Sequence, residues 1–244
     1  MTRIGISQSE STIVRDSQAY WQGESGTRWR KSSHWRGDDG LSEEQWDQLG
    51  REHLRLFDRL VRVLGTETPM PRVVEWGCGG GSNAVHFAPR AEQFIGVDVA
   101  AASLAECEKQ VERVCTTPFQ GVLAKAPEPE AAARQVSQPC DLFLCLHVLE
   151  CLPTPEYGLR VMRIARDMLR PGGLAFVQVK YSTTSWRTKP RRRSYRHSFG
   201  QMTTYRIEEF WTSMQECGLR PEAVSLVPST RVGDRYAYFL LSKT

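Results

Sequence analysis

The sequence predicts an α/β fold in which a mostly parallel sheet carries helices on both faces. From about residue 69 onward, short apolar segments alternate with amphipathic ones, as strands and helices do in such a sheet. The segment 141–146 is apolar along most of its length, which is typical of a strand buried on both faces. A run of glycines at 77–81 directly follows the first strand. The length of 244 residues suits one such domain with an attached cap.

A long helix is expected ahead of the sheet. Ser42 and Gln45 have the spacing of a capping box, in which each satisfies a backbone N–H group of the other. Apolar residues then recur at helical spacing as far as Leu64, and Gly65 ends the run. We therefore expect a helix between Ser42 and Gly65 that places one face against the core.

The remaining elements are expected in alternating order. Ser82 can cap the helix that follows the glycine run and stops at Pro89. Residues 170–173, Arg-Pro-Gly-Gly, are typical of a turn. The expected strands are 72–75, 94–97, 119–123, 141–146 and 174–181, with a closing pair at 224–227 and 236–241, and the expected helices are 101–114, 159–169 and 206–217.

The amino-terminal part is polar but rich in tryptophan, at positions 21, 29, 35 and 46. Tryptophan is costly to leave in water, so this part should fold over another surface. We expect residues 1–68 to form a helical, Trp-rich cap. Residues 69–244 should form the main domain, into which a basic loop at 182–204 is inserted.

Composition excludes several classes. No apolar run reaches the roughly 18 residues that a membrane span needs, and the amino terminus lacks the apolar stretch of a secretory signal. The cysteines number seven, and none forms a Cys-x-x-Cys pair. Paired histidines at metal-ligand spacing are also lacking. We expect buried, reduced thiols, no metal site and a cytoplasmic location.

The net charge of +4 is concentrated in one segment. Residues 187–196 contain six cations and no acid, and without them 26 basic residues face 28 acidic ones. This basic segment suits a solvated loop, an anchor for an anionic small molecule, or a nucleic-acid contact. Six cations on a mildly acidic body are a small electrostatic footprint for nucleic acid, so we favour the first two interpretations.

The segment 73–82 contains most of the candidate cofactor-binding residues. Glu75 stands at a strand end, glycines follow at 77, 79 and 81, and Asp98 ends the next strand. The glycines allow a sharp turn and a close approach to a ligand, and the acid at 98 can accept the hydroxyls of a ribose. The dinucleotide fingerprint requires a third glycine at position 82, which is serine. Glu75 would repel a pyrophosphate but suits a cationic amino group, which favours S-adenosylmethionine (SAM).

These motifs resemble those of class I SAM-dependent methyltransferases. The resemblance covers about residues 69–182 and includes the segments Asp141–Cys151 and 159–181. It implies a Rossmann-like sheet of seven strands, the last antiparallel, and a reaction that converts SAM to S-adenosylhomocysteine (SAH). The implied cofactor contacts are Gly77, Gly79 and Gly81 along the methionine part, Glu75 at its amino group, Asp98 at the ribose, Val99 at the adenine and Leu146 near the sulfonium. The adenine amino contact is left open, with the backbone around Lys125 and Ala126 as one option.

The acceptor is less well defined. His147 follows the fourth strand and His197 lies in the loop after the fifth, so both are candidate general bases. We expect methyl transfer to oxygen or nitrogen of a small molecule, such as an anionic or sugar-like metabolite. Two alternatives are an RNA methyltransferase, in which Trp186 and Tyr195 would stack on bases, and a non-catalytic SAM-binding module that contacts a partner through the basic loop. The oligomeric state is left open.

Overall fold

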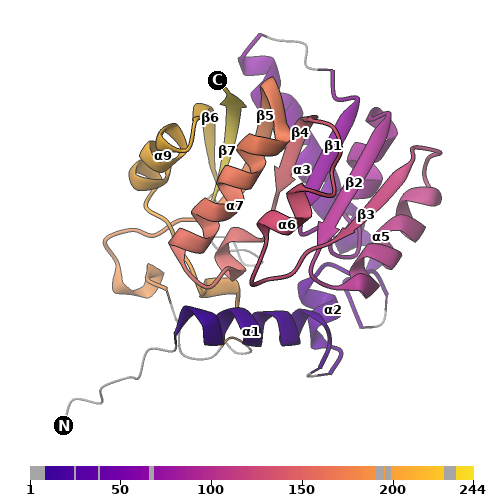
Figure 1. Ribbon diagram of the computed structural model, residues 1–244, viewed down its shortest axis with the longest axis horizontal. Coiled ribbons are helices and arrows are strands. Elements are labelled where there is room, and N and C mark those ends of the chain that lie inside the picture. The colour runs from indigo at the N-terminus through magenta and orange to yellow at the C-terminus, as the bar shows by residue number, and fades with distance from the viewer. Residues whose placement is uncertain are drawn as a thin grey trace.

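The computed structural model describes residues 9–24, 26–37, 39–65, 69–190, 195, 199–227 and 235–244. Its centre is a seven-stranded sheet with the order β3-β2-β1-β4-β5-β7-β6 (Figure 1). The strands are β1 Arg72–Trp76, β2 Gln93–Asp98, β3 Phe119–Leu123, β4 Cys140–Cys145, β5 Leu169–Lys180, β6 Leu219–Val227 and β7 Tyr236–Lys243. The α-helices are α1 Glu10–Trp21, α2 Arg28–Ser32, α3 Glu43–Val63, α4 Ala84–Phe87, α5 Ala101–Glu112, α6 Glu130–Ala133, α7 Pro155–Met168 and α9 Ile207–Glu216. Short 3₁₀ turns are η1 Ala88–Arg90, η2 Leu149–Cys151, η3 Trp186–Thr188 and η4 Phe199–Gln201.

The topology confirms the predicted sheet. Strands β1 to β5 pair in parallel, whereas β7 is antiparallel to both of its neighbours, β5 and β6. The strand order reverses between β1 and β4, because β2 lies on one side of β1 and β4 on the other. Open sheets of this type bind ligands at such a reversal, outside the carboxyl ends of the strands.

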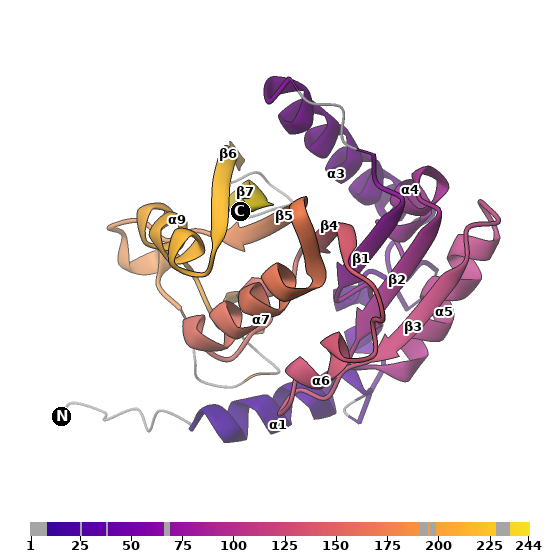
Figure 2. The same cartoon turned by 45° about the horizontal axis from the view of Figure 1, so that its top comes forward.

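Both faces of the sheet are buried, which is why β4 is apolar apart from Asp141. Phe143 and Cys145 belong to the core under α6, α7 and α9, whereas Leu142 and Leu144 belong to the core under α3, α4 and α5. Figure 2 shows these two sets of helices on opposite sides of the sheet. The alternation follows from the two-residue period of a strand.

The long helix α3 begins as predicted, with the complete capping box of Ser42 and Gln45. Two other local predictions are wrong. Asn83, not Ser82, is the N-cap of α4, and it makes no capping hydrogen bond because its side chain serves Glu75 and His53 instead. The expected turn at 170–173 lies inside β5, which begins at Leu169 because that residue already pairs with Cys140 of β4.

The amino-terminal segment lies across the carboxyl ends of the parallel strands, where Figure 1 shows α1 running along that edge. Ile13, Tyr20 and Trp29 form a small core with Tyr195 and Met202, which come from the chain between β5 and α9. Trp46 of α3 is also buried and donates a hydrogen bond from Nε1 to the His34 carbonyl over 2.9 Å. Buried Trp29 and Trp46 therefore help to hold this segment in place over the strand ends.

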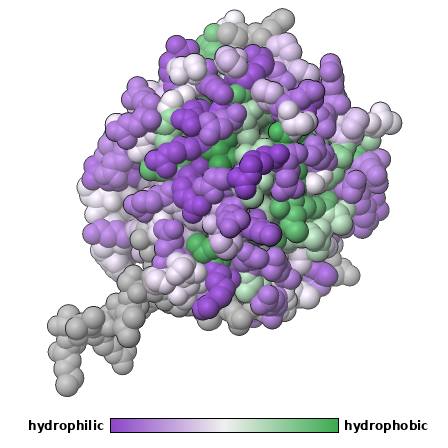
Figure 3. All heavy atoms as spheres, in the orientation of Figure 1, coloured by the Kyte–Doolittle hydropathy of each residue, from purple (hydrophilic) through white to green (hydrophobic). Residues whose placement is uncertain are grey.

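The face of the molecule drawn in Figure 3 is mostly hydrophilic, with hydrophobic patches among the charged residues. Within the described ranges, every helix is too short or too polar to cross a bilayer. All seven cysteines are free thiols, and six of them are buried, as the sequence predicts.

Candidate active site

A cavity of about 870 Å³, its mouth included, opens at the carboxyl ends of β1, β2 and β4. Pockets of this size accommodate ligands as large as nucleosides and cofactors. Five of the residues predicted to contact the cofactor lie in its wall, namely Gly77, Gly79, Asp98, Val99 and Leu146. Residues 32–34 of the amino-terminal segment close the cavity from the other side.

The glycine turn leaves no space for side chains. At Gly79, with a φ of +51°, a Cβ would stand 2.2 Å from the Ser33 carbonyl oxygen. At Gly77, with a φ of +76°, it would stand 2.4 Å from Cγ2 of Val148. The Gly80 N–H group donates to the Ser33 carbonyl over 2.8 Å. The turn is therefore in direct backbone contact with the segment that closes the cavity.

Gly81 has a different environment from the one the sequence implied. Its φ is +85°, and a Cβ there would stand 3.2 Å from Cα of Cys107 in α5. Among the described residues, the cavity wall includes Gly77 and Gly79 but not Gly81. Gly81 thus allows α5 to pack closely against the turn, and like Glu75 it is absent from the described cavity wall, so its contact with the methionine part stays a prediction.

Glu75 lies beneath the turn, and its side chain is 1% exposed. Its Oε1 accepts a hydrogen bond from the Asn83 amide over 2.8 Å, while Oε2 is buried with no partner among the described residues. Burial raises the pKa of Glu75 to about 8, an effect that the Asn83 bond opposes and the charge of Asp98 reinforces. At pH 7 a group with this pKa is mostly protonated, and a cation that approaches Oε2 would favour its ionised form.

The Asn83 side chain is itself held by a buried chain of hydrogen bonds. His53 Nδ1 lies 2.7 Å from Asn83 Oδ1, and His53 Nε2 lies 3.2 Å from the Tyr238 hydroxyl. Burial and the neighbouring His147 lower the pKa of His53 to about 3, so the imidazole is neutral. The proton sits on Nδ1, because Asn83 Oδ1 can only accept, and Tyr238 donates to Nε2.

Asp98 stands at the end of β2, where it faces the cavity. Its two carboxylate oxygens accept hydrogen bonds from the backbone N–H groups of Gly79, over 3.0 Å, and Ala100, over 2.9 Å. Burial raises the pKa of Asp98 to about 6, and these backbone bonds oppose the rise. The remaining acceptor sites on its oxygens suit a pair of ribose hydroxyls.

The adenine end, which the sequence left open, is covered by α1. Lys125 and Ala126 line this end of the cavity, as the sequence suggested they could. The Ala126 N–H group donates to Oε1 of Gln18 over 3.3 Å, and its carbonyl accepts from the Tyr157 hydroxyl over 2.5 Å. Gln22 donates to the Val99 carbonyl over 3.3 Å. Residues of α1 thus fix the backbone around the expected adenine position, a role that no sequence motif indicated.

On the opposite side, His147 lies in the cavity wall. Its φ of +57° places it in the left-handed region, and its backbone N–H donates to Oε1 of Gln178 over 2.9 Å. Its ring Nδ1 lies 3.3 Å from Oε1 of Glu150, a buried acid. His147 therefore has the surroundings of a general base whose second nitrogen faces a carboxylate. The other candidate, His197, lies outside the described residues.

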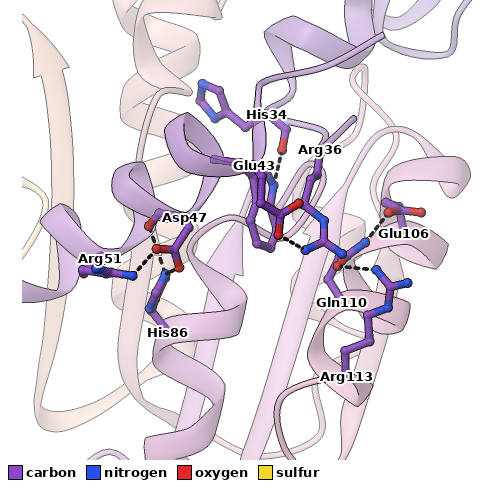
Figure 4. Close-up of polar contacts among 10 residues, drawn as sticks. His34, Arg36, Glu43, Asp47, Arg51, His86, Glu106, Gln110 and Arg113 are labelled. Atoms are coloured by element: carbon purple, nitrogen blue, oxygen red, sulfur yellow. Dashed lines mark hydrogen bonds and ion pairs between the residues drawn. The ribbon is translucent and has the colours of Figure 1, made fainter. Parts of the chain in front are cut away.

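A second histidine in this wall was missed by the sequence analysis. His34 follows α2, and its ring centroid lies 5.0 Å from that of His147. Figure 4 shows its imidazole pointing away from the contact between Arg36 and Glu43. No motif marks His34, because only the fold of the amino-terminal segment brings it to the strand ends.

Only one of the two aromatic residues near the basic loop is exposed, whereas the RNA-binding hypothesis needs both to stack on bases. Tyr195 is 1% exposed and lines the cavity. Its hydroxyl accepts from Trp21 Nε1 over 2.7 Å and donates to the Cys151 carbonyl over 2.9 Å. Tyr195 is therefore not available to stack on a base, whereas Trp186 is 72% exposed. Residues 191–194 and 196–198 of the basic loop lie outside the described part of the chain.

These residues fit SAM. The orphaned Oε2 of buried Glu75 suits the cationic amino group of its methionine part, and Asp98 suits its ribose. Val99 and Leu146 also lie in the cavity wall, and their positions beside the adenine and the sulfonium stay predictions. Within the described ranges, no group of three or more His, Cys, Asp or Glu side chains could hold a metal ion.

Comparison with known proteins shows the family of the chain. A family model described as a methyltransferase domain matches residues 48–224. The ubiquinone biosynthesis O-methyltransferase of Pseudomonas fluorescens SBW25 is 31% identical over 148 residues, which are 57% of this chain and 58% of that enzyme. The match thus spans less than two thirds of the relative's length.

Solved structures share the fold. Magnesium protoporphyrin IX methyltransferase from Synechocystis PCC 6803, determined with bound SAH, has a TM-score of 0.65 at 17% identity and covers 96% of this chain and 100% of its own. The 1,6-didemethyltoxoflavin-N1-methyltransferase of Burkholderia thailandensis has a TM-score of 0.62 at 15% identity and covers 100% of this chain and 93% of its own. The chain therefore belongs to the methyltransferase-domain family, within the class I, Rossmann-like group that uses S-adenosylmethionine.

Proposed function

We propose that this protein is a SAM-dependent methyltransferase that acts on a small molecule and releases SAH. One observation carries the proposal: the wall of a single cavity contains Asp98, Gly77 and Gly79 of the turn, and His147. The expected nucleoside site and a candidate proton acceptor thus share one cavity. The closing segment, residues 32–34, belongs to the 1–68 region that we propose to be a cap.

The residues have separate roles in this proposal. SAM supplies a methyl group already activated by the positive charge on sulfur. Glu75 binds the amino group, Asp98 binds the ribose, and Gly77 and Gly79 let the backbone approach closely. Holding two reactants aligned and away from water can lower a barrier by about 7–11 kcal/mol. The main contribution of this chain to the rate is therefore to hold SAM and the acceptor in position.

His147 acts as the general base when the acceptor is a hydroxyl. The acceptor O–H bond breaks, its proton passes to the free imidazole nitrogen, and the electron pair stays on oxygen. Glu150, whose Oε1 lies 3.3 Å from His147 Nδ1, stabilises the resulting imidazolium. A base of this kind contributes about 10²–10⁴-fold to the rate. An amine acceptor that is already deprotonated would not need it.

The small-molecule class is supported by the size of the cavity, about 870 Å³ with its mouth, and by the named relatives. The similar proteins above are named as a ubiquinone biosynthesis O-methyltransferase, a magnesium protoporphyrin IX methyltransferase and a 1,6-didemethyltoxoflavin-N1-methyltransferase. Buried Tyr195 removes one of the two stacking residues on which the RNA alternative depended.

Calorimetry with SAM, SAH and NAD tests the cofactor. We expect SAM and SAH to bind and NAD not to bind, and binding of NAD alone would contradict the proposal. Transfer of a labelled methyl group to a fraction of small metabolites tests catalysis, and its absence for every fraction would favour the non-catalytic module.

Once an acceptor is found, His147→Gln should lower kcat by about 10²–10⁴-fold without changing SAH affinity. His86→Gln is the matched control, because His86 of α4 contacts Asp47 and lies outside the cavity wall. It should retain the activity of the unaltered protein. Equal losses in the two variants would argue against a role for His147 in proton transfer.

A further inference from the structure

We propose that His34 and His147 form a two-imidazole clamp for the acceptor, and that this acceptor is an uncharged molecule bearing a hydroxyl group on an apolar body. The inference rests on the proposed function and extends it to the chemical class of the acceptor. It assigns a substrate contact to the amino-terminal segment, which no sequence motif indicated.

The backbone conformation at these two positions supports the proposal. Among the described residues, His34 and His147 are the only non-glycine residues with a positive φ, at 53° and 57°. Such conformations cost about 1–3 kcal/mol each and persist where the surroundings impose them. Trp46 Nε1 holds the His34 carbonyl over 2.9 Å, and Gln178 Oε1 holds the His147 N–H over 2.9 Å. Contacts from two separate elements thus hold the two strained residues beside each other, with their rings edge to face.

The rings give the second argument. Their centroids are 5.0 Å apart, their planes cross at 77°, and both side chains belong to the cavity wall. Nδ1 of His147 lies 3.3 Å from Oε1 of Glu150, to which it donates when it is protonated, and 3.3 Å from the amide Nε2 of Gln178. The structure gives the His34 ring no hydrogen-bond partner among the described residues. A half-buried imidazole without a protein partner is free to bond to a ligand.

Charge is the third argument. Burial, then the facing His147 and the nearby His53, hold the pKa of His34 well below its usual value, so this ring is neutral at pH 7. The neighbours that face the pair are His53 of α3, Glu150 of η2 and Tyr236 of β7. In the described wall, the acidic and basic side chains other than histidine are Asp98 and Lys125, which belong to the end where the nucleoside is expected. An anionic acceptor would find no described cation beside the histidines, whereas a neutral hydroxyl finds two hydrogen-bonding nitrogens.

The two imidazoles have different parts in this arrangement. His147 takes the proton of the acceptor hydroxyl, because Glu150 stabilises its cation. His34 stays neutral, since two facing cations would repel each other, and it hydrogen-bonds the same oxygen or an adjacent one. Trp21, Val148 and Leu152 lie in the same wall and offer apolar surface to the rest of the acceptor.

The test uses the full-length protein saturated with SAH and labelled with ¹³C at histidine Cε1. Phenol is the uncharged hydroxyl probe and benzoate is the anionic probe of similar size. We expect phenol to shift the His34 and His147 resonances while leaving His86 unchanged. Phenol should bind at least about tenfold more tightly than benzoate, a ratio that corresponds to about 1.4 kcal/mol.

The variant His34→Gln should weaken phenol binding by about tenfold and leave SAH affinity within a factor of about two, as expected for one lost hydrogen bond to ligand. His86→Gln should change neither. The proposal is overturned if His34→Gln binds phenol like the unaltered protein, if benzoate binds more tightly than phenol, or if phenol shifts His147 alone.

A second measurement does not depend on any acceptor. In His147→Gln the facing imidazole is gone, so the pKa of His34 should rise, as read from its Cε1 resonance against pH. An unchanged titration would contradict the coupling of the pair. Failure of SAH to bind would instead contradict the proposed function, and the titration can still be recorded on the free protein.

Discussion

Asn83 donates a hydrogen bond from its side-chain amide to Oε1 of Glu75 over 2.8 Å. The orientation of this amide is fixed from its other end, because Asn83 Oδ1 accepts from Nδ1 of a neutral His53. The Glu75 carboxyl group is therefore held with Oε1 satisfied and Oε2 left without a partner among the described residues. Oε2 of this buried acid is therefore placed to accept a hydrogen bond from a positively charged ligand group.

Proton release should accompany cofactor binding at neutral pH. The pKa of Glu75 is about 8 in the free protein, so at pH 7 most of this group is protonated. A cationic amino group favours the carboxylate and expels that proton. Calorimetry of SAH binding in two buffers with different ionisation enthalpies measures the release. Glu75→Gln should bind SAH more weakly and release no proton, and equal release from both proteins would rule out Glu75 as the source.

The same group should make the free protein less stable as the pH rises. The pKa of Glu75 is about 8 in the folded protein against 4.5 ordinarily, so the folded state holds more protons and loses stability as the pH rises through this range. Asp98, whose pKa is raised, also makes the folded protein less stable as the pH rises, but only up to about pH 6. His53, whose pKa is lowered, has the opposite effect on stability, and it acts below pH 6.5.

Glu75 is therefore expected to dominate among these three groups between about pH 6.5 and pH 8. The free energy of unfolding should fall there by up to about 1.4 kcal/mol per pH unit. Urea unfolding at several pH values measures the slope, and Glu75→Gln should flatten it. A slope that survives in this variant must come from another group.

The order of strands, the glycine turn and the two acids could be predicted from sequence because each depends on local pattern. Asn83 and His53 could not, since they are 30 residues apart and meet only when α3 packs against the turn. His34 was missed for the same reason. Gly81 has the spacing of the motif, yet it lies against α5, because spacing does not distinguish a glycine that faces a ligand from one that faces a helix.

Asp98→Asn should weaken SAH binding by roughly 10- to 150-fold, because hydrogen bonds to a charged partner are worth about 1.5–3 kcal/mol. The variant keeps the size of the side chain but replaces one acceptor oxygen with an NH₂ group. Since both Asp98 oxygens accept from backbone N–H groups of Gly79 and Ala100, one of these bonds is also lost. Calorimetry gives the affinity, and thermal unfolding shows whether the turn itself is weakened. An unchanged affinity would remove Asp98 from the ribose site.

Gly80→Ala tests whether the amino-terminal segment closes the cavity. A Cβ at this position would stand 2.6 Å from the His34 carbonyl oxygen and 2.6 Å from Cα of Trp35, so the segment must move away. Gly121→Ala is the matched control, because a Cβ there meets nothing nearer than 3.5 Å. We expect Gly80→Ala to speed proteolytic cleavage within residues 22–41 and to weaken SAH binding, while Gly121→Ala leaves both unchanged. Because the added methyl group faces the closing segment, unaltered cleavage in Gly80→Ala would show that this segment is not held against the turn in solution.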